Sequence, residues 1–179
     1  MISKTLETSI LNAIAQAYNG AGGSASSYTV TFPSAGYLAL FTTMPTRSTT
    51  QGQEGELTGA VEVSGGGYAR VDLDGTPLGG GHYFASAPTW DNANKCFVIK
   101  NSTAIQFPMA TAAWTGDNTH IVGFGIYDAA TSGNLTMAGY LVDADGYKDS
   151  VDVPANNAVA FAAGQLQISL TDTIPADPA

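Results

Sequence analysis

The first apolar pattern along the chain has the period of a helix. Its residues recur at spacings of three and four, namely Leu6, Ile10, Ala13, Ile14, Ala17 and Tyr18. Ser3 is a suitable N-cap, and Asn19-Gly20 can end a helix in the left-handed conformation. A helix from Ser3 to Tyr18, about sixteen residues long, is marginal alone in water. Its apolar face must therefore dock on its own subunit or on a neighbour.

From Tyr28 onward the pattern has the period of two that indicates β-strands. Gly36–Phe41 is continuous enough for a strand buried on both faces. His120–Tyr127 contains two glycines, which indicates close approach by a ring or a backbone. The shorter predicted strands are Tyr28–Phe32, Val61–Val63, Tyr68–Leu73, Cys96–Ile99, Ala104–Phe107, Leu135–Leu141, Val151–Val153, Ala158–Phe161 and Gln165–Leu170. Thr46–Thr58 lacks apolar anchors and predicts an exposed loop.

About ten short strands separated by Gly, Asn and Asp turns predict a mainly β fold. We expect an antiparallel β-sandwich or barrel, jelly-roll-like, with a short N-terminal α-helix. Residues 1–19 are expected to form a docking or oligomerisation helix and residues 20–27 a small-residue linker. Residues 28–171 are then a single β domain, and residues 172–179 a C-terminal tail.

Charge narrows the function classes. The 179 residues carry 15 acids and 6 bases, a net charge of −9, and only 12% are charged. Six bases cannot form the basic stripe that nucleic-acid binding requires, and an acidic surface disfavours anionic membranes. No apolar stretch reaches the roughly 18 residues needed to span a bilayer, and no secretory signal is evident. We therefore expect no nucleic-acid and no membrane partner.

Few residues suggest catalysis or metal binding. His82 and His120 have no metal-ligand spacing, and they are interpreted as turn or strand-end residues. Gly65–Gly67 and Gly79–Gly81 predict turns rather than phosphate loops, because no helix start follows them. Cys96, the single cysteine, is expected to be a buried small hydrophobe. We predict no catalytic residue, no cofactor and no bound metal.

Two acidic features leave alternatives open. Asp143-Ala-Asp145-Gly146 resembles the start of a calcium loop, but Tyr147 and Pro154 stand where further ligands belong. An acidic turn is the favoured reading, with a partial site involving Asp149 and Asp152 as the alternative. A glycan hydrolase would need paired carboxylates in a cleft, for which Asp72, Asp74, Asp143 and Asp145 are the candidates.

Trp90 and Trp114 lie among small polar residues. Burial under a loop is the favoured interpretation for both indoles. The alternative is a sugar-binding role by stacking.

Several longer motifs resemble a family of small structural proteins of tailed phages and prophages, often labelled tail-fibre proteins. The motifs are Tyr37–Pro45 (YLALFTTMP), Glu62–Arg70 (EVSGGGYAR), Ile105–Trp114, Val122–Leu135 (VGFGIYDAATSGNL) and Phe161–Leu166. The similarity extends over residues 3–170. The segments Thr46–Ala60, Asp72–Lys95 and Val142–Val153 look longer than the common form, and inserted loops add surface for partners.

The resemblance implies a non-enzymatic virion protein, assembled in the host cytoplasm, that acts by binding other virion proteins. We favour a capsid-surface decoration protein and a homo-oligomer, most simply a trimer, because neutral surfaces suit multivalent docking. A tail-fibre or tail-tip component that binds the host is the alternative. A tail-associated hydrolase is the third reading.

Overall fold

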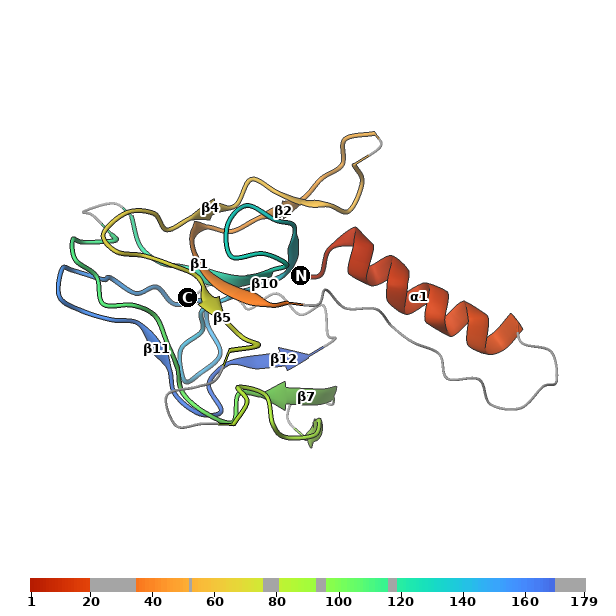
Figure 1. The fold of residues 1–179 in the computed structure, drawn as a ribbon. Helices are drawn as coiled ribbons and strands as arrows, with labels where there is room; N and C mark the ends of the chain where they lie inside the picture. Colours follow the sequence, from red (N-terminus) through yellow and green to blue (C-terminus); the bar gives the residue numbers. More distant parts are fainter. Residues whose placement is uncertain (20–34, 52, 76–80, 93–95, 116–118, 170–179) are drawn as a thin grey trace.

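The computed structural model describes residues 1–19, 35–51, 53–75, 81–92, 96–115 and 119–169 (Figure 1). The elements are α1 (Lys4–Asn19), β1 (Tyr37–Thr43), β2 (Thr46–Arg47), β3 (Leu57–Thr58), β4 (Val61–Glu62), β5 (Val71–Asp72), β6 (Thr89–Asp91), β7 (Cys96–Lys100), β8 (Ile105–Gln106), β9 (Gly123–Tyr127), β10 (Leu135–Tyr140), β11 (Ala160–Phe161) and β12 (Gln167–Ser169). The predicted linker, the strand Tyr28–Phe32 and the tail 172–179 lie outside the described residues.

The predicted mainly β class is confirmed, and every strand pairing is antiparallel. The largest sheet has the order β10-β9-β1-β4, and β5 also pairs with β1. Three smaller sheets pair β11 with β8, β12 with β7 and β6, and β2 with β3. No closed barrel forms among the described residues.

Strand β1 is the centre of the large sheet, as its continuous apolar run predicts. Four successive side chains, Leu38 to Phe41, are completely buried, because both faces of the strand are covered. Leu38 and Leu40 belong to the main core. Ala39 and Phe41 point to the opposite face, into a second cluster with Met44 and Ala138. Both faces of this strand therefore contribute to the stability of the fold.

The main core lies between the large sheet and the smaller sheets of the C-terminal half. It joins Leu38 and Leu40 of β1 to Ile105 of β8, Phe161 of β11 and the buried Leu166 before β12. Segments far apart in sequence meet in this layer, so its formation requires most of the β body. This arrangement makes the short strands mutually dependent.

The glycines of β9 allow close packing, as the sequence predicts. A Cβ built on Gly125 would lie 2.5 Å from Cε2 of Phe41 and 2.7 Å from Cδ1 of Leu135. Gly125 is paired with Ala39 in β1 and with Ala138 in β10. Its missing side chain lets the Phe41 ring lie against the sheet.

Helix α1 also forms where predicted. Its first turn is held to the body, because Ser3 Oγ accepts a hydrogen bond from the N–H of Leu6 and the N–H of Ser3 donates to the Thr136 carbonyl at 2.8 Å. Ile2 forms a bridge with Met137, which extends the large sheet beside β10. Leu6 is 4% exposed, whereas Leu11 is 57% exposed. Beyond its first turn the helix projects away from the strands (Figure 1).

Three local predictions need correction. Thr46–Thr58 is not only a loop, because β2 and β3 pair within it as a largely polar hairpin that alternation of apolar residues does not reveal. Tyr68–Leu73 contains only the two-residue strand β5, since Tyr68 and Arg70 project into a polar network. Val151–Val153 contributes a single bridge, from Val151 to Ile121.

Candidate functional site

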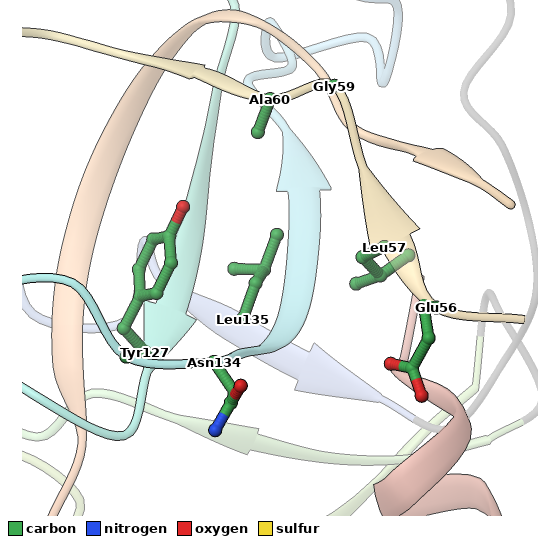
Figure 2. A pocket seen from close by; sticks show the side chains of 8 residues that line it. Glu56, Leu57, Gly59, Ala60, Tyr127, Asn134 and Leu135 are labelled. Carbon is green, nitrogen blue, oxygen red and sulfur yellow. The ribbon is translucent and has the colours of Figure 1, made fainter. Parts of the chain in front are cut away.

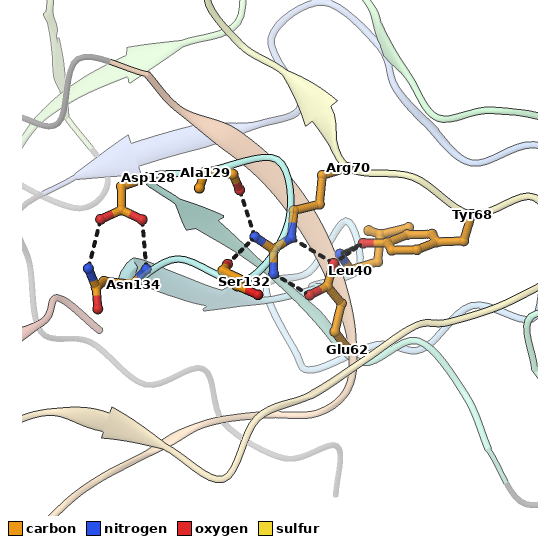
Figure 3. A network of polar contacts seen from close by, with 8 residues as sticks. All are labelled: Leu40, Glu62, Tyr68, Arg70, Asp128, Ala129, Ser132 and Asn134. Atoms are coloured by element: carbon orange, nitrogen blue, oxygen red, sulfur yellow. Dashed lines mark hydrogen bonds and ion pairs between the residues drawn. The ribbon is translucent and has the colours of Figure 1, made fainter.

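The most elaborate polar arrangement centres on Arg70, whose side chain is only 8% exposed (Figure 3). Its Nε and Nη2 donate to the two carboxylate oxygens of Glu62 at 2.9 and 2.6 Å. Its Nη1 donates to the carbonyls of Ala129 and Ser132, each at 2.7 Å. The guanidinium also lies 3.5 Å from the centre of the Tyr127 ring. One face of this cation therefore lies on an aromatic ring, and all three of its nitrogens donate hydrogen bonds within the protein.

Tyr68 extends the network into the centre of the large sheet. Its hydroxyl donates to Glu62 Oε1 at 3.0 Å and accepts from the N–H of Leu40 at 2.9 Å. Burial is the main cause that raises the pKa of Tyr68 far above its ordinary value. The phenol therefore stays protonated and fixes the position of the Glu62 carboxylate rather than exchanging protons with a substrate.

The loop between β9 and β10 is the second partner of Arg70. Asp128 accepts hydrogen bonds from the side chain and the N–H of Asn134, at 2.9 and 2.6 Å. These two bonds hold the pKa of Asp128 below its ordinary value. Ser132 and Gly133 both have positive φ, 57° and 77°. This segment is a tight turn, and the two bonds from Arg70 hold it against the sheet.

A third motif joins through the glycine turn that precedes Tyr68. The carbonyl of Gly66 accepts from Trp114 Nε1 at 2.9 Å and from the N–H of Thr111 at 2.7 Å. Gly66 has a φ of 54°, and an added Cβ would lie 2.5 Å from the Ala112 carbonyl oxygen. Trp114 is 6% exposed, so its predicted burial is confirmed. The glycines act as a tight turn here, as predicted.

The motifs at Glu62–Arg70, Ile105–Trp114 and Val122–Leu135 thus converge in space. Their polar atoms satisfy one another, and their aromatic rings pack together, with Tyr68 stacked on Phe107 at 6.0 Å and edge-on to Trp114 at 5.3 Å. These hydrogen bonds and ring contacts are made within the protein, and they hold the loops of the three motifs in place.

An open pocket of about 300 Å³ lies beside this network (Figure 2). Tyr127, Gly133, Asn134 and Leu135 form one side of it, and Glu56, Leu57, Gly59 and Ala60 form the other. Glu56 is its single charged lining residue. The Asp72, Asp74, Asp143 and Asp145 carboxylates considered for a hydrolase do not line it.

The remaining polar candidates are at the surface. His82 is exposed, and His120 Nδ1 lies 2.5 Å from Asp152 Oδ1 in a pair that is itself largely exposed. Asp143 Oδ1 accepts from the N–H groups of Asp145 and Tyr147 at 3.0 and 2.9 Å, which is the geometry of an acidic turn. In the described ranges, no three His, Cys, Asp or Glu side chains gather closely enough to hold a metal ion.

Two hydrophobic candidates differ from expectation. Cys96 is only partly buried, since it stands at the start of strand β7 rather than inside the core. Trp90 is 51% exposed and stands directly opposite Phe97, which is 63% exposed. The favoured interpretation of burial is wrong for Trp90, because its face of the β6–β7 ladder is open.

Sequence reasoning missed one buried polar residue. Asn101 lies in the polar stretch between the predicted strands Cys96–Ile99 and Ala104–Phe107, yet it is 2% exposed. Its side chain donates to the carbonyls of Thr103 and Ala162, each at 2.8 Å, and accepts from the N–H of Leu166 at 2.8 Å. Asn101 thereby holds the Phe161–Leu166 motif against β7. An asparagine that follows an apolar strand was the available signal.

These features define a mainly β structural module whose shared motifs maintain loop geometry. Residues 1–169 match the family model described as Podophage GP4 fiber I protein gp80, and the chain belongs to that family. It is therefore a structural protein of a phage virion, as the motif resemblance predicts. A search of curated proteins gave no match. Within the described residues, no helix is both long and apolar enough to cross a membrane.

Proposed function

We propose that the chain is a non-enzymatic fibre subunit that attaches to the virion through α1 and presents its β body outward. The projecting helix carries this proposal: its first turn is fixed to the body, while Leu11, seven residues before Tyr18 and so on the same side of the helix, is 57% exposed. A 16-residue helix with an apolar face requires a partner surface in water. The fibre description of the matched family agrees with this assignment.

The partner of the helix is another virion protein or a second copy of the chain, and a homotrimer is the assembly we favour. Three copies would enclose the apolar faces of three helices away from water, which one projecting helix cannot do for itself. Light scattering on the purified protein tests this. A monomeric mass at micromolar concentration would exclude the homotrimer, and another virion protein would then be the partner of the helix.

Capsid-surface decoration, which the sequence alone favoured, is the second candidate. A projecting helix suits docking on a capsid as well, and only 12% of the residues are charged, which suits repeated contact with a shell. The two candidates differ in where the protein lies on the particle.

Gold-labelled antibodies on intact virions separate them by electron microscopy. Label at the tail or at fibres supports the proposed function, and label scattered over the head supports decoration instead. Particles assembled with Leu11→Ser should lose the label in either case, whereas Val61→Ser, at a similarly exposed position on the body, should retain it. Retention by both variants would contradict attachment through the helix.

A further inference from the structure

The most exposed aromatic residues of the described chain form a pair on the β6–β7 ladder. Trp90 and Phe97 are direct cross-strand partners, 51% and 63% exposed. Their ring centres are 5.3 Å apart and the ring planes meet at 70°. The two rings therefore meet at a corner on the surface of the ladder, and each ring forms one side of that corner. Exposed aromatic groups of this kind mark interaction sites.

The exposed area of the two side chains indicates whether their partner is large or small. A Trp or Phe side chain presents about 150–250 Å² when fully uncovered, so the half-exposed pair offers roughly 200 Å². A stable protein interface buries about 800 Å² on each partner. The patch is thus about a quarter of what a second protein needs, but it matches the area of one or two sugar rings.

The surroundings favour a polar ligand with apolar faces. Asn92, exposed beside the pair, accepts a hydrogen bond from Trp90 Nε1 at 3.4 Å, which brings its amide next to the ring. A pyranose ring offers C–H groups that stack on aromatic faces and hydroxyls that hydrogen bond to amide groups. The net charge of −9 on the chain disfavours acidic sugars by like-charge repulsion.

We infer that Trp90 and Phe97 form a binding site for neutral glycans, with a pyranose ring stacked in the corner between the two rings and hydroxyls directed to Asn92. This inference rests on the proposed fibre function for its biological setting. A site of this size binds weakly as a single copy, and many copies on one particle give a strong combined attachment.

The test is retention of the purified full chain on a printed array of bacterial surface polysaccharides with neutral and acidic repeat units. Wild type should be retained on neutral polysaccharides. Trp90→Ala and Phe97→Ala should each weaken retention at least about tenfold. Trp90→Phe keeps a ring and should remain within about threefold of wild type. Met109→Ala removes a 62% exposed side chain elsewhere and is the matched control, with unchanged retention.

Circular dichroism checks that each variant is folded, and light scattering follows its mass. Absence of retention on every neutral polysaccharide would overturn the inference, as would equal retention of Trp90→Ala and wild type. A fall in oligomer mass confined to the Trp90 and Phe97 variants would identify the pair as a contact between copies instead. The array result is independent of the antibody labelling, so failure of this inference leaves the fibre assignment unaffected.

Discussion

The Arg70 network and the Trp90–Phe97 pair both combine aromatic and polar side chains, but the first is buried and the second is exposed. In the network, the Arg70 side chain is 8% exposed and Trp114 is 6% exposed, and their polar atoms are hydrogen bonded within the protein. In the pair, both residues are more than half exposed. The difference separates residues that hold the fold from residues that are available to a partner. Motif residues that attract attention in the sequence belong to the first group.

The largest expected effect follows from breaking the network at its centre. Arg70→Ala would leave the Glu62 carboxylate, 22% exposed, without its cation and two carbonyls without their donor. We expect a loss of about 3–5 kcal/mol in the free energy of unfolding, measured by urea denaturation. Arg47→Ala, which breaks an exposed pair with Glu7, should cost less than about 1 kcal/mol. Equal losses for the two variants would contradict a buried role for Arg70.

The close packing at β9 provides the next comparison. Gly125→Ala would force the new Cβ within 2.5 Å of the Phe41 ring, and we expect it to destabilise the protein by about 2–3 kcal/mol. Gly59 instead has a positive φ, 76°, and nothing lies within 4 Å of an added Cβ. Gly59→Ala should cost only about 1 kcal/mol from backbone strain. Thermal unfolding of both variants measures the difference, and the reverse order would be inconsistent with the packing of Phe41.

Tyr68→Phe tests the link between the network and β1. The substitution keeps the ring on Phe107 and removes the hydroxyl that serves Glu62 and the N–H of Leu40. A buried N–H that loses its partner costs about 1–3 kcal/mol, and we expect a loss within this range in urea denaturation. Slower hydrogen exchange of the Leu40 N–H in Tyr68→Phe than in wild type would contradict the expected loss of stability.

How much of this arrangement the sequence predicts depends on the range of the interactions. Helix α1 and strands β1, β9 and β10 follow from local patterns, because capping and alternation act between near neighbours. Arg70 was missed, since its partners Ala129 and Ser132 are about sixty residues away and only the folded topology brings them together. Trp90 was misjudged for a related reason: its exposure depends on which layers cover the β6–β7 ladder.

A smaller effect is expected from pH. The folded-state pKa of Asp128 lies below its ordinary value because of Asn134, so the carboxylate contributes stability above the unfolded pKa, about 4, and loses it as pH falls through the folded value. Urea midpoints should therefore decrease on acidification below pH 4. Asp128→Asn should reduce this dependence, and an unchanged profile would show that the Asn134 bonds do not contribute.

The central claim is that stability and binding are assigned to different residues, and one experiment measures both. Urea midpoints and retention on the neutral polysaccharides would be determined for wild type, Arg70→Ala and Trp90→Ala in parallel. Arg70→Ala should lose about 3–5 kcal/mol of stability. Trp90→Ala should stay within about 0.5 kcal/mol of wild type and lose retention. A stable Arg70→Ala protein, or a Trp90→Ala protein that loses its stability, would contradict the claim.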